Sequence, residues 1–239
     1  MPGLDHFFKL LRAAPAGAVF NPWYQRDLEH DASPGAPGIR RAQLRAYLEE
    51  RRQARIILLA EALGYQGGHF TGIPMTSERL LLGHLRPQGL EPGMVFSGPA
   101  RRTSRESLKS SGFTEPTCTV VWKSVCEAGL DPRMVILWNA FPWHPYKPEK
   151  GMLSNRTPSD TELVLARPVL KALHDYVPGA AVLAVGRKSG RLLADMGVMA
   201  GELRHPANGG AGLFRAQFMR AAKLFSGNVD TRGTGDILK

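Results

Sequence analysis

Four short apolar runs, separated by charged amphipathic stretches, constrain the fold of this chain more than any other feature. They are RIILLA at 55–60, MVILW at 134–138, AVLAV at 181–185 and the less apolar GELRH at 201–205. Continuous apolar runs of this length are typical of strands that are buried on both faces of a parallel sheet. The sequence therefore predicts four parallel strands.

Amphipathic patterns typical of helices lie between and after these runs, at 41–53, 119–128, 160–176, 189–196 and 212–225. Strands that alternate with helices imply right-handed crossovers and helices on both faces of the sheet. A chain of 239 residues is long enough for one such core and leaves little room for a second domain. The expected fold class is α/β, a single-domain α/β/α sandwich around a central four-stranded parallel sheet, with an N-terminal extension over residues 1–40.

The ligand cleft of such a sheet lies beyond the carboxyl ends of its strands. Polar groups follow all four runs: Glu61 comes directly after the first, Asn139 after the second, the segment 186–189 after the third, and His205 ends the fourth. The sequence thus predicts that a carboxylate, an amide and an imidazole meet at one edge of the sheet.

The segment 86–116 does not fit the alternation of strands and helices. It contains Pro87, Pro92 and Pro99, followed by the basic, serine-rich tract RRTSRESLKSSG at 101–112. Loops of this length without secondary structure are uncommon unless they are functional or mobile. We interpret the segment as a basic flap beside the cleft, with a disordered surface loop as the alternative.

Thirty-one Lys and Arg residues against 21 Asp and Glu residues give the chain a formal net charge of +10. An excess of this size favours a polyanionic partner, and nucleic acid is the first candidate. A basic surface that serves only solubility is the alternative. No stretch approaches the roughly 18 consecutive apolar residues of a transmembrane helix, and the N-terminus lacks the features of a secretory signal. We therefore expect a cytoplasmic protein with no membrane partner.

Several chemistries that depend on a bound group are disfavoured. The glycines after the first run, at 64, 67 and 68, do not form the Gly-x-Gly-x-x-Gly turn of dinucleotide-binding folds. The segment 186–189 resembles the end of a P-loop but lacks its first glycine. Two cysteines, Cys118 and Cys126, are too few for a four-thiolate iron–sulfur cluster and do not have the spacing of a zinc pair. We expect chemistry performed by polar side chains, with no metal and no cofactor.

Taken in order, the loops after the four runs resemble the uracil-DNA glycosylase superfamily. EALG at 61–64 is similar to the Gly-Glu-Ala-Pro-Gly motif of the thermostable bacterial and archaeal branches. Asn139 ends the second strand, and HPAN at 205–208 is similar to the second motif, His-Pro-Ser-x. NRTP at 155–158, before a helix, is also found in these branches. The resemblance covers about two-thirds of the chain and implies an enzyme that flips uracil out of DNA and hydrolyses its N-glycosidic bond, leaving an abasic site.

Three departures point to an atypical branch. Ala62 stands where the housekeeping branch has the aspartate that handles the attacking water, the cysteines of the iron–sulfur cluster are missing, and the segment 86–112 is long. A lyase needs an amine nucleophile, and no lysine stands in the loops after the first, second and fourth runs, so the expected enzyme is monofunctional. A non-catalytic or slow-turnover binder of abasic or damaged DNA is the second hypothesis, and a nucleotide- or RNA-binding α/β protein is the third.

A glycosylase rotates the target nucleotide out of the duplex and reads the edge of its base in a pocket. Asn139 is the candidate reader, because a fixed amide accepts from uracil N3–H and donates to O4, whereas cytosine reverses both partners. Phe70, between the glycines of GHFTG, is the candidate to stack on the flipped ring. Gly64 and Tyr65 complete the substrate-binding set, with Tyr65 beside uracil C5. The alternatives are a loop-capping role for Asn139 and a core position for Phe70.

Cleavage of the glycosidic bond builds positive charge on the sugar and negative charge on the departing base. His205 is the candidate donor to uracil O2, and Glu61 is the candidate to position the water and offset the charge at the sugar. For Glu61 the alternative is a structural ion pair with a nearby arginine.

Phosphate contacts position a protein on DNA without reading its sequence. The candidate DNA-binding residues are Arg101, Arg102 and Arg105 in the basic tract, Arg187, Lys188 and Ser189 after the third run, and Asn208 and Leu213 after His205. Asn208 or Leu213 is also the candidate wedge that fills the gap left by the flipped base. The expected partner is DNA that contains uracil or abasic sites, bound by a monomer.

Overall fold

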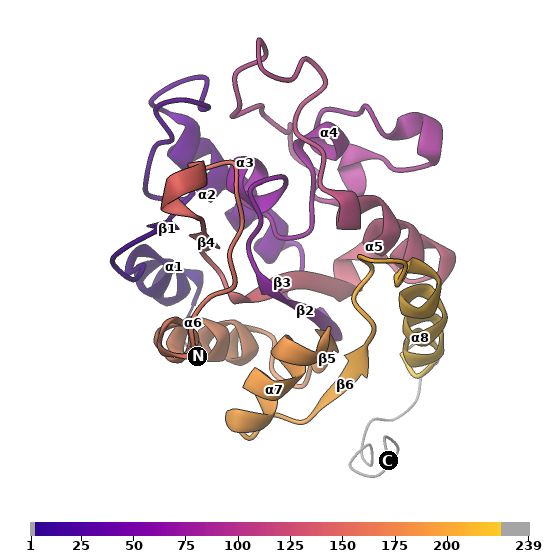
Figure 1. Ribbon diagram of the computed structural model, residues 1–239. Coiled ribbons are helices and arrows are strands. Elements are labelled where there is room, and N and C mark those ends of the chain that lie inside the picture. The colour runs from indigo at the N-terminus through magenta and orange to yellow at the C-terminus, as the bar shows by residue number, and fades with distance from the viewer. Residues whose placement is uncertain (1–2, 226–239) are drawn as a thin grey trace.

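The four apolar runs form one parallel sheet in the computed structural model, which describes residues 3–225 (Figure 1). Its strands are β2 (Ile56–Ala62), β3 (Val135–Phe141), β5 (Ala181–Val185) and β6 (Ala200–Leu203), in the spatial order β3-β2-β5-β6. All three neighbouring pairs are parallel. The predicted α/β class with a four-stranded parallel sheet is therefore confirmed.

Helices cover both faces of this sheet. Its crossovers place α6 (Asp160–Tyr176) and α7 (Arg187–Asp195) on one face, and α5 (Pro116–Glu127) and α8 (Ala211–Lys223) on the other (Figure 1). The remaining elements are α1 (Leu4–Arg12), α2 (Ala36–Glu49), the short α3 (Gly68–Thr71) and α4 (Glu78–Leu81), and an antiparallel pair formed by β1 (Val19–Phe20) and β4 (His144–Pro145). The described residues also contain four 3₁₀ turns, at Arg86–Gln88, Pro92–Met94, Pro132–Met134 and Pro148–Lys150.

Helix boundaries follow local capping chemistry. α6 has the predicted bounds because Ser159 and Glu162 form a reciprocal capping box at its start. The helix predicted at 41–53 instead runs over Ala36–Glu49. Pro37 fits its first turn, because the N–H groups of that turn have no acceptor within the helix and the missing N–H of proline costs no hydrogen bond. It ends before Arg51, whose buried guanidinium donates to the backbone carbonyls of Tyr47, Met94, Val95 and Val135.

Residues 4–40 pack into the core. α1 buries Leu4, Phe7, Phe8 and Leu11, and it packs against α6. Further along, Arg40 and Asp31 form a fully buried ion pair with an Nη1–Oδ1 distance of 2.6 Å. The segment predicted as an extension thus contributes buried side chains to the same core as the sheet.

The basic tract of the segment 86–116 is anchored by one buried carboxylate. Glu78 accepts hydrogen bonds from the backbone N–H groups of Thr103 at 2.8 Å and Ser104 at 3.0 Å, and from the Ser104 hydroxyl. Ser104 also forms a β-bridge with Asp31. These contacts hold the tract against the N-terminal segment.

Within residues 3–225, no helix combines the length and the apolar character needed to cross a membrane.

Candidate active site

A pocket of about 490 Å³ opens at the carboxyl edge of the sheet. This volume lies in the range of small-molecule sites. Four residues predicted for the site line it: Glu61, Gly64, Asn139 and His205. Its other walls include Met75, Glu115, Thr117, Lys147 and the run from Asn155 to Thr157. Segments far apart in the sequence therefore meet as the strand order predicts.

Asn139 lines this pocket and carries a buried polar atom without a partner among the described residues. It lies on β3 opposite Ala60 of β2, and its side chain is 2% exposed. Its Oδ1 has no hydrogen-bond partner among residues 3–225. A buried acceptor without a partner costs about 1–3 kcal/mol. The arrangement provides an acceptor that a ligand N–H can satisfy.

His205 has a defined tautomer. Its Nδ1 accepts the Ala207 backbone N–H at 3.1 Å, so the neutral ring carries its proton on Nε2. Burial, assisted by the charge of Arg204, lowers the pKa of His205 below its ordinary value and favours this neutral form. Gly210 makes the tight turn possible, because a Cβ at this position would lie 2.0 Å from the His205 carbonyl oxygen. His205 can therefore offer an N–H donor without carrying a charge.

Glu61 is held by an ammonium group. Its Oε1 lies 3.2 Å from Lys188 Nζ, which also donates to Thr157 Oγ1 at 2.8 Å. The Glu61 side chain is 32% exposed, so the carboxylate stays accessible to water. An ion pair was one expectation for Glu61, but its partner is Lys188 and not an arginine.

A second carboxyl group, Glu115, lines the same pocket. Its Oε1 accepts hydrogen bonds from the backbone N–H of Thr117 at 3.3 Å and from the Thr117 hydroxyl at 2.6 Å. Burial raises the pKa of this carboxyl group. Its Oε2 faces the loop after β2, where a Cβ on Gly67 would lie 2.9 Å away. Gly67 thus leaves the space that this carboxyl occupies.

Phe70 does not lie in the pocket wall, contrary to the prediction. Its side chain is 0% exposed and stacks on Phe113, with ring centroids 4.0 Å apart. The short helix α3 turns it into the core, where apolar burial is most favourable. Met75 lines the pocket instead, and its φ of 50° places a non-glycine residue in the left-handed region. Such strained backbone is concentrated at functional sites.

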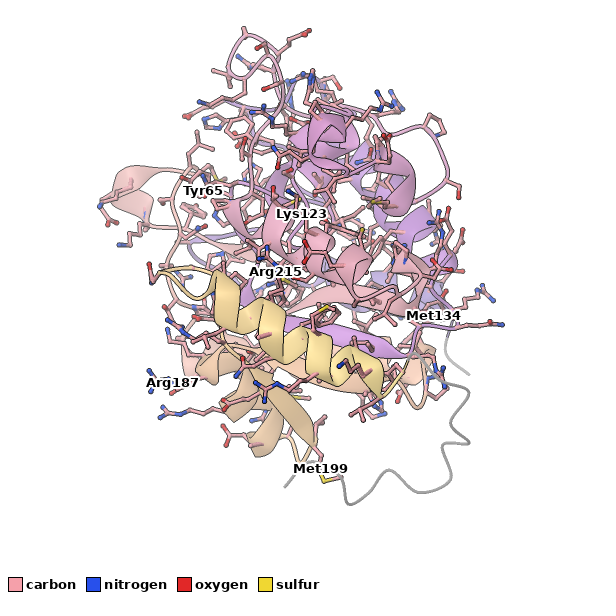
Figure 2. All side chains as sticks on the ribbon, turned by 90° about the vertical axis from the view of Figure 1, so that its right-hand side faces the viewer. Tyr65, Lys123, Met134, Arg187, Met199 and Arg215 are labelled. Carbon is pink, nitrogen blue, oxygen red and sulfur yellow. The ribbon has the colours of Figure 1, made fainter. Side chains whose placement is uncertain are left out.

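Tyr65 and Gly64 lie at the start of the same loop. Gly64 lines the pocket, and the Tyr65 backbone N–H donates to Asn155 Oδ1 at 3.1 Å. The Tyr65 ring is tilted against His144, with centroids 6.5 Å apart, and Figure 2 shows its position on the ribbon. Asn155 therefore ties the loop after β2 to the opposite wall.

A buried chain of imidazoles lies behind this wall. His69 Nε2 lies 3.0 Å from Asp27 Oδ2, and His69 Nδ1 lies 3.1 Å from His144 Nδ1. His144 Nε2 in turn lies 2.7 Å from the Ser154 carbonyl oxygen, next to the pocket residue Asn155. Burial lowers the pKa of His69 to about 4 and that of His144 to about 3. Burial therefore favours the neutral form of both rings.

The predicted DNA-binding residues after β5 and β6 divide into two groups. Arg187 is exposed and projects from the molecule (Figure 2), and Asn208 and Leu213 are also exposed, Leu213 by 60%. Ser189 is buried, and its hydroxyl donates to the carbonyls of Val185 and Gly186, so it does not face solvent as expected. A second pocket of about 480 Å³ lies beside Arg187 and shares His205 with the first.

The predicted residues of the basic tract are partly occupied by backbone contacts. Arg102 donates to the carbonyls of Lys109 and Ser110, and Arg105 Nη2 donates to the Leu28 carbonyl at 2.8 Å. Arg101 is exposed. The side chains of Arg102 and Arg105 therefore stabilise the shape of the tract.

Several pocket residues were not predicted from the sequence. Glu115 and Met75 carry no local motif that marks them as pocket residues. Asn155 and Thr157 stand in the NRTP segment, which resembles a segment of known glycosylases. That resemblance assigns no role to either residue, but it is the one sequence signal for a third wall of the pocket.

Comparison with known proteins supports the fold. No protein-family model matches the chain, and no curated protein matches it in sequence. The crystal structure of wild-type SMUG2 from Pedobacter heparinus is similar, with a TM-score of 0.57 and 14% sequence identity. The alignment covers 92% of this chain and 97% of that chain. At this level of identity the likeness concerns the fold, and the α/β sandwich described above is common to both proteins.

Proposed function

We propose that this protein is a DNA glycosylase that removes uracil and leaves an abasic site. The observation that carries the proposal is the buried, unpartnered Oδ1 of Asn139 in a pocket that also contains Glu61 and His205. Such an acceptor suits the N3–H of uracil, and the amide nitrogen of the same side chain suits O4. The fold shared with SMUG2, a member of the uracil-DNA glycosylase superfamily, and the net charge of +10 support DNA as the partner.

The proposed reaction assigns one task to each polar group. Glu61 accepts a proton from a water molecule as the water oxygen bonds to C1′ of the sugar and the bond from C1′ to uracil N1 breaks. The departing electron pair is delocalised onto uracil O2, where the neutral His205 donates from Nε2. Met75 supplies an apolar face to the base in place of Phe70.

Exposed residues near the pocket are proposed to contact the DNA around the flipped base. Arg187 contacts the DNA backbone, and Leu213 or Asn208 enters the gap that the flipped base leaves. The protein works as a cytoplasmic monomer and uses no metal or cofactor.

A single-uracil oligonucleotide tests the proposal. Incubation with the protein followed by alkali should cut the strand at the uracil, whereas strands with cytosine or thymine stay intact. Asn139→Asp should lower excision, because a carboxylate cannot donate to O4. Gln53→Glu also replaces an amide by a carboxylate, but on an exposed residue before the start of β2, whereas the pocket lies at the carboxyl end of that strand. This control variant should leave excision unchanged. An uncut uracil strand across a range of salt concentrations would refute the proposal.

A second candidate function is the binding of abasic DNA without useful turnover. The ion pair between Glu61 and Lys188 favours it, because a neighbouring ammonium offsets the negative charge that the sugar requires. This function predicts tighter binding to abasic DNA than to uracil DNA, and a Glu61→Ala variant that binds as well as the parent.

A further inference from the structure

Lys188 occupies a place that differs from the phosphate-binding role predicted for it. It lies in the first turn of α7, after Gly186, whose φ of 92° permits the sharp bend from β5. Lys188 is exposed like its neighbour Arg187, with 56% of its side chain accessible, but its ammonium contacts Glu61 and Thr157. Both of these partners line the pocket.

We propose that Lys188 is a positioning residue that acts through Glu61. The inference rests on the proposed function, because it concerns how the carboxylate is held toward the attacking water. Lys188 anchors Oε1 and leaves Oε2 available for that water. Orientation of a reacting group in this way is a large part of enzymatic rate enhancement.

The need for an anchor follows from the surroundings of Glu61. Lys188 is the one hydrogen-bond partner that the described part of the chain provides for its carboxylate. A glutamate side chain has several rotatable bonds, and this one is partly exposed, so without a partner it samples many orientations. Lys188 removes that freedom at the end of β2.

The same ammonium joins two walls of the pocket. Thr157, its second partner, follows Asn155, which accepts the Tyr65 backbone N–H from the loop after β2. Lys188 therefore ties the end of β2 to the segment before α6, and Asn155 ties the loop after β2 to the same segment. The contact with Thr157 fixes the direction of the exposed Lys188 side chain toward Glu61.

Three roles for Lys188 give different kinetics. A positioning residue supports the chemical step, a phosphate contact supports DNA binding and its salt dependence, and an ammonium that merely neutralises Glu61 slows the reaction. Removal of the charge therefore lowers the single-turnover rate in the first case, raises KM in the second and accelerates the reaction in the third.

The experiment measures single-turnover uracil excision and DNA affinity as a function of salt for Lys188→Met and Lys188→Arg. We expect Lys188→Met to lower the single-turnover rate by about tenfold to a hundredfold, with KM and the salt slope unchanged. Lys188→Arg retains a donor to Oε1 and should recover most of the rate. Combined with Glu61→Gln, the Met substitution should add little further loss, since both act on one carboxylate.

Two further variants serve as controls. Lys171→Met removes an exposed charge on α6, paired with Asp175, and should change neither rate nor affinity. Arg187→Met should raise KM and reduce the salt slope by about 1, as expected for a phosphate contact. Thermal unfolding of each variant verifies that it folds.

The outcomes separate the two proposals. Excision by the parent protein combined with an unchanged or faster rate in Lys188→Met overturns the positioning role alone. A loss confined to KM and the salt slope also overturns it, in favour of phosphate binding. No excision by the parent protein overturns the proposed function, and the positioning role falls with it.

Discussion

The amide oxygen of Asn139, which has no hydrogen-bond partner among residues 3–225, leads to a prediction that opposes the usual effect of a core substitution. Asn139→Leu should make the protein more stable while it abolishes uracil excision. Leucine is close to asparagine in size, and it removes a buried acceptor that has no partner within residues 3–225. Binding sites hold such groups at a cost to stability, because they are satisfied by the ligand.

The expected magnitude follows from the cost of one unsatisfied acceptor. Relief of that cost raises the free energy of unfolding by about 1–3 kcal/mol. In a chain of this size, each kcal/mol shifts Tm by roughly 2–4 °C. Asn139→Leu should therefore raise Tm by a few degrees, which thermal unfolding followed by circular dichroism can detect.

Asn21 provides a matched control for this substitution. It is equally buried, but its Oδ1 accepts the Trp23 backbone N–H at 3.2 Å and its Nδ2 donates to the Leu11 carbonyl at 2.9 Å. Asn21→Leu leaves the Trp23 N–H unpaired and removes one of the two hydrogen bonds to the Leu11 carbonyl, which also accepts from Trp143 Nε1, so it should lower the free energy of unfolding by about 1–3 kcal/mol. If Asn139→Leu destabilises the protein as Asn21→Leu does, Asn139 has a permanent partner in solution and the reasoning is wrong.

Three other predictions concern residues that lie outside the pocket lining. Gly210→Ala should slow excision strongly, because the new Cβ displaces the His205 carbonyl; an unchanged rate would contradict the role of that turn. Phe70→Ala should lower the free energy of unfolding by about 3–5 kcal/mol in urea, whereas Phe70→Leu should keep most of the excision rate. A loss of base binding without a loss of stability in Phe70→Leu would show that Phe70 contacts the base. The free energy of unfolding should fall between pH 6.5 and pH 4, by up to about 1.4 kcal/mol per pH unit for each of His69 and His144. Their folded-state pKa values, about 4 and about 3, lie below the unfolded value, so the unfolded chain binds more protons in that window; a flat profile from pH 7 to pH 5 would contradict this.

The parts of the fold that were predicted correctly are those where local and global requirements agree. β5 was predicted with its observed bounds because the run AVLAV is apolar throughout, with Gly179 two residues before it and Gly186 directly after it. α6 was predicted with its observed bounds because its capping box stands in the sequence itself. The start of α2 was missed because Pro37 was not recognised as a residue of a first helical turn.

The residues that line the pocket were predicted where the sheet alone positions them. Glu61 and Asn139 lie within the last three residues of β2 and β3, His205 follows β6 by two residues, and all three line the pocket. The prediction that Phe70 lies in the pocket was wrong, because the glycines around it indicate backbone freedom but do not determine the direction of its ring. That direction is set by packing against Phe113, which lies in a segment interpreted as a flap. Glu115, at the end of the same segment, was missed for the same reason.

The register of the sheet connects these observations. Ala60 pairs with Asn139 in the ladder between β2 and β3, and Glu61 is the next residue along β2. A slip of β3 by one residue would place Trp138 or Ala140 at the pocket and turn the amide to the other face. Every residue of β3 is buried, so such a slip moves its apolar side chains out of position and is strongly disfavoured. The apolar runs that determine the fold therefore also fix the separation of the carboxylate from the amide, and the long segments between them need only close the pocket around that pair.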